Sequence, residues 1–219
     1  MKKSYYTSAE LKSPSLRGGS GGRWEGFCLF FILCTLIFTS CETREDDYRL
    51  AFIGDSNIER WDVCRFFPTF ITENYGKSNS GLNYLEEFAG KFNGKRVVVL
   101  TGTNDLGPSE TPDEMSLFLD MYSESYERAI ENLGAAKIYI FSVLPTNTER
   151  NDMAFIKNDI IKEFNQRMKR CAAHHGWTYL DVYSMLLIDE QLNPSYTLDG
   201  LHPNDACYEI LTNQIIRNY

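Results

Sequence analysis

Residues 97–104 read VVVLTGTN, an unbroken apolar run that ends in a polar turn containing glycine. A second apolar run, IYIF, occupies residues 138–141. Nearly continuous apolar runs of this length are typical of parallel strands that are buried on both faces of a sheet. The sequence therefore predicts a sheet whose two faces are both covered by helices.

On either side of these runs, short apolar segments alternate with longer segments of helical periodicity, from Tyr48 to the end of the chain. We expect five strands, at Arg49–Ile53, Phe70–Tyr75, Arg96–Thr101, Lys137–Leu144 and Thr178–Val182. We expect helices at Asn57–Cys64, Leu82–Phe92, Thr111–Leu133, Asp152–His175 and Asn204–Asn218. Repeated β-α units joined by right-handed crossovers give a three-layer α/β/α sandwich.

Polar residues follow the first three expected strands, at the edge of the sheet where ligands bind in open α/β folds. Ser56 follows Gly54-Asp55 at a turn into a helix, where backbone amides favour developing negative charge, although such triplets are often simple helix caps. Asn104 can donate its side-chain amide to an oxyanion, or close an ordinary Asx turn. Gly81 can bring a backbone N–H close to a ligand, as an ordinary flexible turn also would.

Near the end of the chain, residues 198–204 read LDGLHPN. Asp199 and His202, three positions apart across a tight turn, can place a carboxylate on the imidazole Nδ1–H and leave Nε2 free to accept a proton from a serine. An Asp-x-x-His sequence is common by chance on surface loops. The ordered combination with Ser56 and Asn104 is much less common, and it favours nucleophilic catalysis.

This ordered set resembles the sequence blocks of the SGNH hydrolases, the GDSL-type esterases and lipases. The matching residues are Ser56 in GDS, Gly81, Asn104 in GTND, and Asp199 and His202 in DGLHP, within a resemblance that extends from Tyr48 to Tyr219. Asn57 stands where the family's literal GDSL string has Leu.

The resemblance implies that Ser56 is the nucleophile and that His202, oriented by Asp199, is the general base. It implies an oxyanion hole made by the backbone N–H groups of Ser56 and Gly81 and the side chain of Asn104. It also implies a flavodoxin-like parallel sheet with strand order 2-1-3-4-5, and chemistry that needs no metal or organic cofactor.

The expected function is hydrolysis of a small carboxylic ester, by a carbohydrate O-deacetylase or a short-chain acyl esterase. A lysophospholipase or thioesterase of the same fold is the first alternative. A surface lipoprotein that binds glycans without catalysis is the second. Oligomeric state is left open by the sequence.

Residues 27–38, FCLFFILCTLIF, form a largely apolar run that is 12 residues long, whereas a membrane-spanning helix needs about 20. Basic residues precede this run, and IFTSC at its end resembles a bacterial lipobox. We therefore expect a signal peptide over residues 1–40, a lipidated Cys41, an acidic tether over 41–47 and the hydrolase domain over 48–219. The expected location is the envelope or surface of a bacterial cell, with an uncleaved membrane anchor as the alternative.

The net charge is −8, and residues 1–40 contain five of the 22 basic and two of the 30 acidic side chains, so the remainder carries −11. A surface this acidic repels phosphate backbones, so we do not expect a nucleic-acid partner. Beyond residue 41 the cysteines are Cys64, Cys171 and Cys207, and no pair has CxxC spacing. Their disulfide pairing is left open.

Three further sets of residues could have either a functional or a structural role. Trp61, Phe66 and Phe67 could line a substrate pocket, but aromatic residues at this spacing are more often core. Asn147 leaves the fourth strand at the active edge and could touch substrate. His174 and His175, at the end of a helix beside Gly176, are expected to be structural surface residues.

Overall fold

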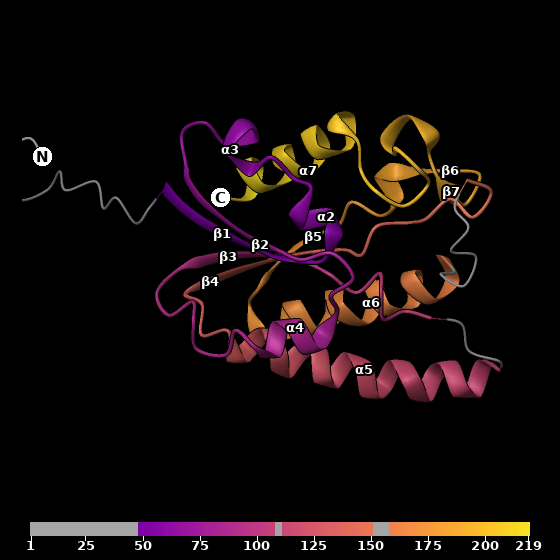
Figure 1. Ribbon diagram of the computed structural model, residues 1–219. Coiled ribbons are helices and arrows are strands. Elements are labelled where there is room, and N and C mark those ends of the chain that lie inside the picture. The colour runs from indigo at the N-terminus through magenta and orange to yellow at the C-terminus, as the bar shows by residue number, and fades with distance from the viewer. Residues whose placement is uncertain (1–47, 108–110, 151–157) are drawn as a thin grey trace, which may run out of the picture. The chain divides into compact units, whose positions relative to one another are not determined.

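A five-stranded parallel sheet forms the centre of the computed structural model, which describes residues 48–107, 111–150 and 158–219 (Figure 1). The strand order is β2-β1-β3-β4-β5, which confirms the predicted order. The strands are β1 (Arg49–Gly54), β2 (Ile71–Gly76), β3 (Arg96–Leu100), β4 (Lys137–Phe141) and β5 (Thr178–Leu180). Each agrees with its prediction to within a few residues.

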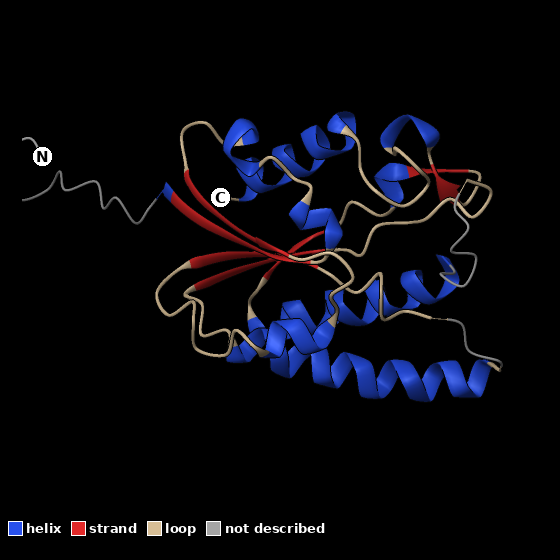
Figure 2. Cartoon of the chain, in the orientation of Figure 1, coloured by secondary structure: helices blue, strands red, loops and turns tan. Residues whose placement is uncertain are grey.

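Helices cover both faces of this sheet, as Figures 1 and 2 show. One face carries α4 (Leu82–Glu86), α5 (Pro112–Asn132) and α6 (Asn158–His175). The other face carries α2 (Ser56–Glu59), α3 (Val63–Phe66) and α7 (Asp205–Asn218). The predicted three-layer α/β/α sandwich is therefore confirmed.

Alternate residues of β1 enter two separate cores, because successive strand side chains point to opposite faces. Ala51 and Ile53 pack with the α4, α5 and α6 side. Leu50 and Phe52 pack on the other face, where the Trp61 ring stacks on Tyr208 with centroids 5.2 Å apart. Trp61 and Phe67 are buried there and Phe66 packs half-buried against the same core, so these aromatic residues are core rather than pocket wall.

Two helix predictions were wrong in extent. The helix expected at Asn57–Cys64 is two short helices, α2 and α3, because Trp61 turns into the core between them and Asp62 caps α3 by accepting the Arg65 N–H. The helix expected at Leu82–Phe92 ends at Glu86, and turns carry the chain from there to the next strand.

Other predicted boundaries fall close to those observed. Helix α5 begins with a capping box, in which Thr111 and Glu114 cap each other's backbone N–H. Helix α6 is described from Asn158 onward, and the earlier part of its predicted range lies outside the described residues.

A short antiparallel hairpin was not predicted. It consists of β6 (Leu187–Ile188) and β7 (Gln191–Leu192), which lie between β5 and α7 with one-turn 3-10 helices on either side. The predicted signal peptide, Cys41 and the tether lie outside the described residues. Within the ranges that the structure describes, no helix has the length and apolar character to cross a bilayer.

Candidate active site

Ser56 lies at the carboxyl edge of the sheet, where β1 ends against β3. A Cβ atom on Gly54 would lie 1.9 Å from the carbonyl oxygen of Leu100, so this close approach of the two strands requires glycine. Asp55 then caps α2 by accepting the Asn57 backbone N–H at 2.9 Å. Ser56 is the first residue of that helix and is 8% exposed.

Asp199 and His202 lie in a tight turn directly before α7. Oδ1 of Asp199 accepts the backbone N–H groups of Leu201 at 3.0 Å and His202 at 2.8 Å. The Thr197 hydroxyl donates to the His202 carbonyl oxygen and accepts the Gly200 N–H, both at 2.9 Å. Both ends of the turn are therefore fixed by hydrogen bonds.

The three predicted catalytic side chains form one continuous chain of contacts. His202 Nδ1 lies 2.7 Å from Asp199 Oδ2, and His202 Nε2 lies 3.0 Å from Ser56 Oγ. Because an ionised carboxylate can only accept, the Asp199 contact places the ring proton on Nδ1. Nε2 is then free to accept the Ser56 hydroxyl proton, which is the geometry of a general base.

The Asp199 carboxyl is well suited to this role. Partial burial acts to raise its pKa, but hydrogen bonds from the backbone and ring of His202 and from the Leu201 N–H outweigh burial and lower the pKa below its ordinary value. Asp199 therefore remains ionised at neutral pH and accepts the Nδ1 proton.

Asn104 and Gly81 lie in two loops that contact each other at the same edge of the sheet. The Asn104 side-chain amide donates to the Ser80 carbonyl oxygen at 2.8 Å, which leaves its second hydrogen available. The Ser80 hydroxyl donates to the Gly54 carbonyl oxygen at 3.3 Å and so connects these loops to the Ser56 turn. Among the described residues, none accepts a hydrogen bond from the backbone N–H of Ser56 or Gly81.

Asp105 supports these loops and was missed by the sequence analysis. Its Oδ2 accepts the Leu82 N–H at 3.0 Å and the Tyr122 hydroxyl at 2.7 Å. A Cβ atom on Gly81 would lie 2.1 Å from Asp105 Oδ1, so the carboxylate packs directly against this glycine. The available signal was its position immediately after Asn104 in GTND.

Asn147 supports the turn that carries Asp199 and His202. Its backbone N–H donates to the Gly200 carbonyl oxygen at 2.7 Å, and its side-chain amide donates to the Leu192 carbonyl oxygen at 2.9 Å. With only 5% of its surface exposed, Asn147 is positioned to hold this turn rather than to touch substrate.

Behind Ser56, the Asp55 carboxyl is completely buried. Burial raises its pKa to about 7; the Asn57 N–H opposes this change, and the nearby Asp105 carboxylate adds to it. Asp55 Oδ2 has no hydrogen-bond partner among the described residues. Near neutral pH, the Asp55 carboxyl is therefore protonated and uncharged in a substantial fraction of the molecules, while it still caps α2.

An open surface pocket adjoins the turn that carries the histidine. Leu198 and Pro203, which flank that turn, line the pocket together with Arg60, at the end of α2, and Tyr208 of α7. The Tyr208 hydroxyl donates to the Asn57 carbonyl oxygen at 2.9 Å and so connects α7 to α2, the helix that begins with Ser56. The lining is mixed, with apolar side chains beside a guanidinium group.

Comparisons with known proteins agree with this architecture. A GDSL-like lipase from Bacteroides thetaiotaomicron superposes with a TM-score of 0.61 at 22% identity, covering 86% of this chain and 96% of that one. An acetylxylan esterase from Geobacillus stearothermophilus gives a TM-score of 0.56 at 16% identity, covering 78% and 93%. At these identities the two structures show a shared fold.

The N-acylneuraminate cytidylyltransferase of Escherichia coli O18:K1:H7 (strain RS218 / NMEC) is 29% identical over 176 residues. The match takes in 76% of this chain but spans only 39% of that protein's length. The family described as GDSL-like lipase/acylhydrolase matches residues 52–210, which is more than half of the chain and includes every residue of the site described above. The chain therefore belongs to the GDSL-like lipase/acylhydrolase family of ester-bond hydrolases, as its sequence motifs indicate.

Proposed function

We propose that the chain hydrolyses carboxylic esters with Ser56 as nucleophile, His202 as general base and Asp199 as the group that orients the imidazole. The observation that carries this proposal is the pair of contacts from His202, 3.0 Å to Ser56 Oγ and 2.7 Å to Asp199 Oδ2. A protein that only binds glycans has no need for a serine, a histidine and a carboxylate aligned in this way.

In the acylation step, Ser56 Oγ attacks the ester carbonyl carbon while its proton passes to His202 Nε2. The carbonyl oxygen becomes an oxyanion, for which the proposed donors are the backbone N–H groups of Ser56 and Gly81 and the free amide hydrogen of Asn104. The imidazolium then gives its proton to the leaving alkoxide. The alcohol departs and an acyl-serine remains.

In the deacylation step, a water molecule takes the place of the alcohol. His202 Nε2 removes a proton from that water, and the resulting hydroxide attacks the acyl-serine carbonyl carbon. Collapse of the second tetrahedral intermediate breaks the bond to Ser56 Oγ, which regains the proton from His202. The carboxylic acid is released and the enzyme returns to its starting state.

We propose short acyl groups, above all acetyl groups on carbohydrates, as the substrates. The pocket beside the His202 turn is open and partly polar, which suits a sugar alcohol better than a long acyl chain. Among the similar proteins, the acetylxylan esterase and the N-acylneuraminate cytidylyltransferase have names that specify a carbohydrate substrate. The name of the acetylxylan esterase supports a sugar ester over a phospholipid.

Labelling with a fluorophosphonate, which reacts with activated serines, tests the nucleophile. We expect labelling of the folded protein, its loss in Ser56→Ala, and its retention in the control Ser184→Ala, which changes an exposed serine elsewhere. Absence of labelling in well-folded protein would contradict the proposed mechanism.

Turnover of p-nitrophenyl esters of increasing chain length tests the substrate class. We expect kcat/KM to be highest for acetate and to fall steadily towards octanoate. A preference for chains of eight carbons or more would instead support a lysophospholipase or thioesterase of the same fold.

We also propose that the chain is exported and carries lipid on Cys41, since a basic region, an apolar run and the IFTSC sequence precede the acidic tether. Metabolic labelling with an alkyne fatty acid in a bacterial host tests this proposal. We expect label on the wild-type chain and none on Cys41→Ala; equal labelling of both chains would contradict it.

A further inference from the structure

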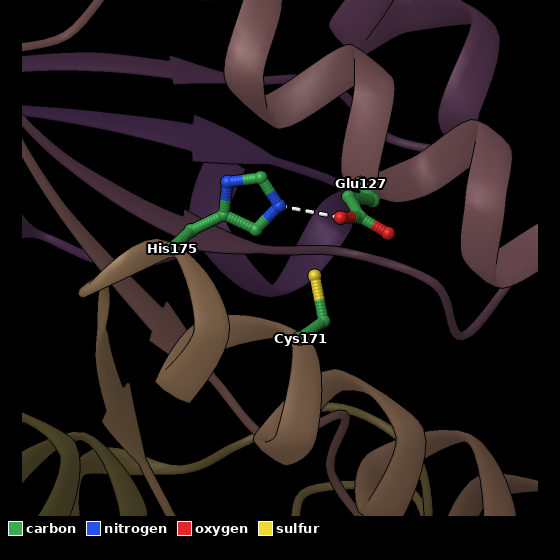
Figure 3. A group of neighbouring side chains, drawn as sticks. All are labelled: Glu127, Cys171 and His175. Carbon is green, nitrogen blue, oxygen red and sulfur yellow. Dashed lines mark hydrogen bonds and ion pairs between the residues drawn. The ribbon is translucent and has the colours of Figure 1, made fainter.

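A second cluster of reactive side chains lies between α5 and α6. Glu127 extends from α5, and Cys171 and His175 extend from α6, where their spacing of four residues places them on one helical face. One ligand atom from each residue lies within 4.8 Å of the other two. Figure 3 shows the imidazole and the carboxylate facing each other, with the thiol directed into the space beside them.

The cluster is remote from the proposed catalytic residues. Helix α6 ends at His175 and β5 begins at Thr178, so the cluster lies near the amino end of a sheet strand. Ser56 lies beyond the carboxyl end of β1, at the opposite edge of this parallel sheet. The cluster is therefore separate from the ester-hydrolysis machinery.

The three ligand types in the Glu127, Cys171 and His175 cluster are ones that Zn²⁺ commonly binds. A thiolate, an imidazole nitrogen and a carboxylate oxygen together favour Zn²⁺ over the harder cations Mg²⁺ and Ca²⁺, which take oxygen ligands. Zinc bond lengths of about 2.0 to 2.3 Å place tetrahedral ligand atoms about 3.4 to 3.6 Å apart. The three atoms, all within 4.8 Å of one another, need only small side-chain rotations to reach that spacing.

The charges around the cluster favour a cation. Burial raises the pKa of the Cys171 thiol to about 12, and the carboxylates of Glu127 and Glu131 add to the rise. The two carboxylates that disfavour a free thiolate attract a dication, and a bound dication stabilises the thiolate that coordinates it. Metal binding would then release the thiol proton to solvent.

Neighbouring groups hold the imidazole in place. The His175 ring stacks on the Trp177 indole with centroids 4.3 Å apart and an interplanar angle of 14°. Gly176, with φ of +69°, turns the chain at the end of α6 so that Trp177 returns over the histidine. In the structure, Nε2 of His175 is hydrogen-bonded to Oε1 of Glu127, so the two atoms face each other and would exchange this hydrogen bond for bonds to the ion.

We propose that Glu127, Cys171 and His175 bind one Zn²⁺, with water as the fourth ligand, and that this ion ties α5 to α6. The ion would hold these two helices together, since its three ligands come from α5 and α6, which pack on the same face of the sheet.

Titration of the full-length chain with Co²⁺, under a non-chelating reductant, tests the site. Co²⁺ in a tetrahedral zinc site with a thiolate ligand gives a near-ultraviolet charge-transfer band and intense visible bands. We expect these bands to saturate at one Co²⁺ per chain and to disappear when Zn²⁺ is added. Cys171→Ser should lose the charge-transfer band, and His175→Ala should weaken Co²⁺ binding at least tenfold.

Two matched controls change the same residue types outside the cluster. Cys64→Ser changes an exposed cysteine on α3, and His174→Ala changes the exposed neighbour of His175. Both should keep the wild-type spectrum. The absence of any band in the wild type, or a charge-transfer band that survives in Cys171→Ser, would overturn the proposal.

Thermal unfolding gives a second, independent measurement. At a Zn²⁺ concentration about 100 times the Kd, we expect the Tm of the wild type to rise by about 5 to 10 °C. Cys171→Ser should show no such rise, while its circular dichroism and p-nitrophenyl acetate hydrolysis without zinc show that it is folded. An equal Tm increase in both proteins would contradict binding at this cluster.

Discussion

The backbone N–H of Asn147 donates to the carbonyl oxygen of Gly200 at 2.7 Å, and so attaches the loop after β4 to the turn that carries Asp199 and His202. The Asn147 side chain extends the same connection to the Leu192 carbonyl oxygen at 2.9 Å. The proposed general base is therefore held by a loop that contributes no proposed catalytic group of its own.

Replacing Asn147 with alanine should weaken this support. The Leu192 carbonyl would lose its buried donor, which typically costs about 1 to 3 kcal/mol in the free energy of unfolding. We expect kcat to fall by about tenfold with little change in KM, because the change displaces the base without removing a substrate contact. Urea unfolding and steady-state kinetics measure both effects. A large rise in KM at constant kcat would indicate a substrate contact instead.

Gly200→Ala should disturb the same turn from the other side. Gly200 has φ of +89°, and a Cβ atom there would lie 2.7 Å from the Asn147 carbonyl oxygen. We expect kcat to fall about 100-fold, as is typical when catalytic groups move by about 1 Å. Gly94→Ala is the matched control, because Gly94 also has positive φ but has no atom within 4 Å of the added carbon. That variant should lose some stability and keep its kcat.

Asp199→Asn should abolish most of the turnover while preserving the fold. An amide can present its NH₂ group to Nδ1, which favours the tautomer whose Nε2 cannot accept the serine proton. In a serine protease the corresponding change lowers kcat by about 10⁴, and we expect a loss of about 10³ to 10⁴ here. Asp113→Asn, which alters an exposed carboxylate in the first turn of α5, is the control and should retain activity. Comparable kcat values for the two variants would exclude the assigned role of Asp199.

Asn104→Ala tests the proposed oxyanion hole. Loss of one side-chain donor from a preorganised oxyanion hole lowers kcat by about 10² to 10³ in enzymes that use one. We expect a decrease of this size with only a small change in KM, since the donor contributes mainly in the transition state. Asn83→Ala, an exposed position on α4, should behave as the wild type. An Asn104→Ala enzyme with normal kcat would remove this side chain from the mechanism.

Asp55→Asn tests the buried helix cap through the pH dependence of stability. The folded-state pKa of about 7 lies above the ordinary value of 3.8, so the folded protein holds this proton more tightly than the unfolded chain does. The stabilisation from this group is complete below about pH 4, and it declines as the pH rises towards 7. The amide of the variant cannot ionise, so the variant should gain stability relative to the wild type as the pH rises.

Urea unfolding at pH 4.5 and pH 8 measures this difference. Between pH 4.5 and pH 8, we expect the free energy of unfolding of Asp55→Asn to increase by roughly 3 kcal/mol relative to that of the wild type. Asp113→Asn, which removes an exposed carboxylate from the first turn of α5, controls for the loss of one surface charge. A gain for Asp55→Asn no larger than that of the control would contradict a raised pKa at this site.

The three layers could be predicted because a strand buried on both faces leaves a local apolar run in the sequence. The strand order could be predicted because the sequence motifs resemble those of a known family. Burial on both faces leaves continuous apolar runs, such as residues 97–100, that no other element explains as well. The positions of Ser56 and Asn104 follow from strand ends, since the carboxyl ends of parallel strands share one edge. The Asp199–His202 turn lies directly before α7, and its place in the site was implied by the family resemblance.

Other features depend on contacts that the sequence pattern does not reveal. Trp61 interrupts an apparently continuous helix because it packs among residues from β1 and α7. The β6–β7 hairpin turns through Asp189 and Glu190, which have φ of 47° and 61° without being the glycine or asparagine that marks such turns. The supporting roles of Asp105 and Asn147 likewise require loops from different strands to be placed side by side.

Ser56 and His202 are in contact although 146 positions separate them along the chain. Synthesis therefore produces the proposed nucleophile early and its base late, and Tyr208 of α7 then connects the helix that follows the base to Asn57 of α2. A nascent or unfolded chain has a serine but no means of activating it. The proposed ester turnover therefore requires the early and late parts of the domain to be packed together, so its appearance would report that the chain has folded through its last helix.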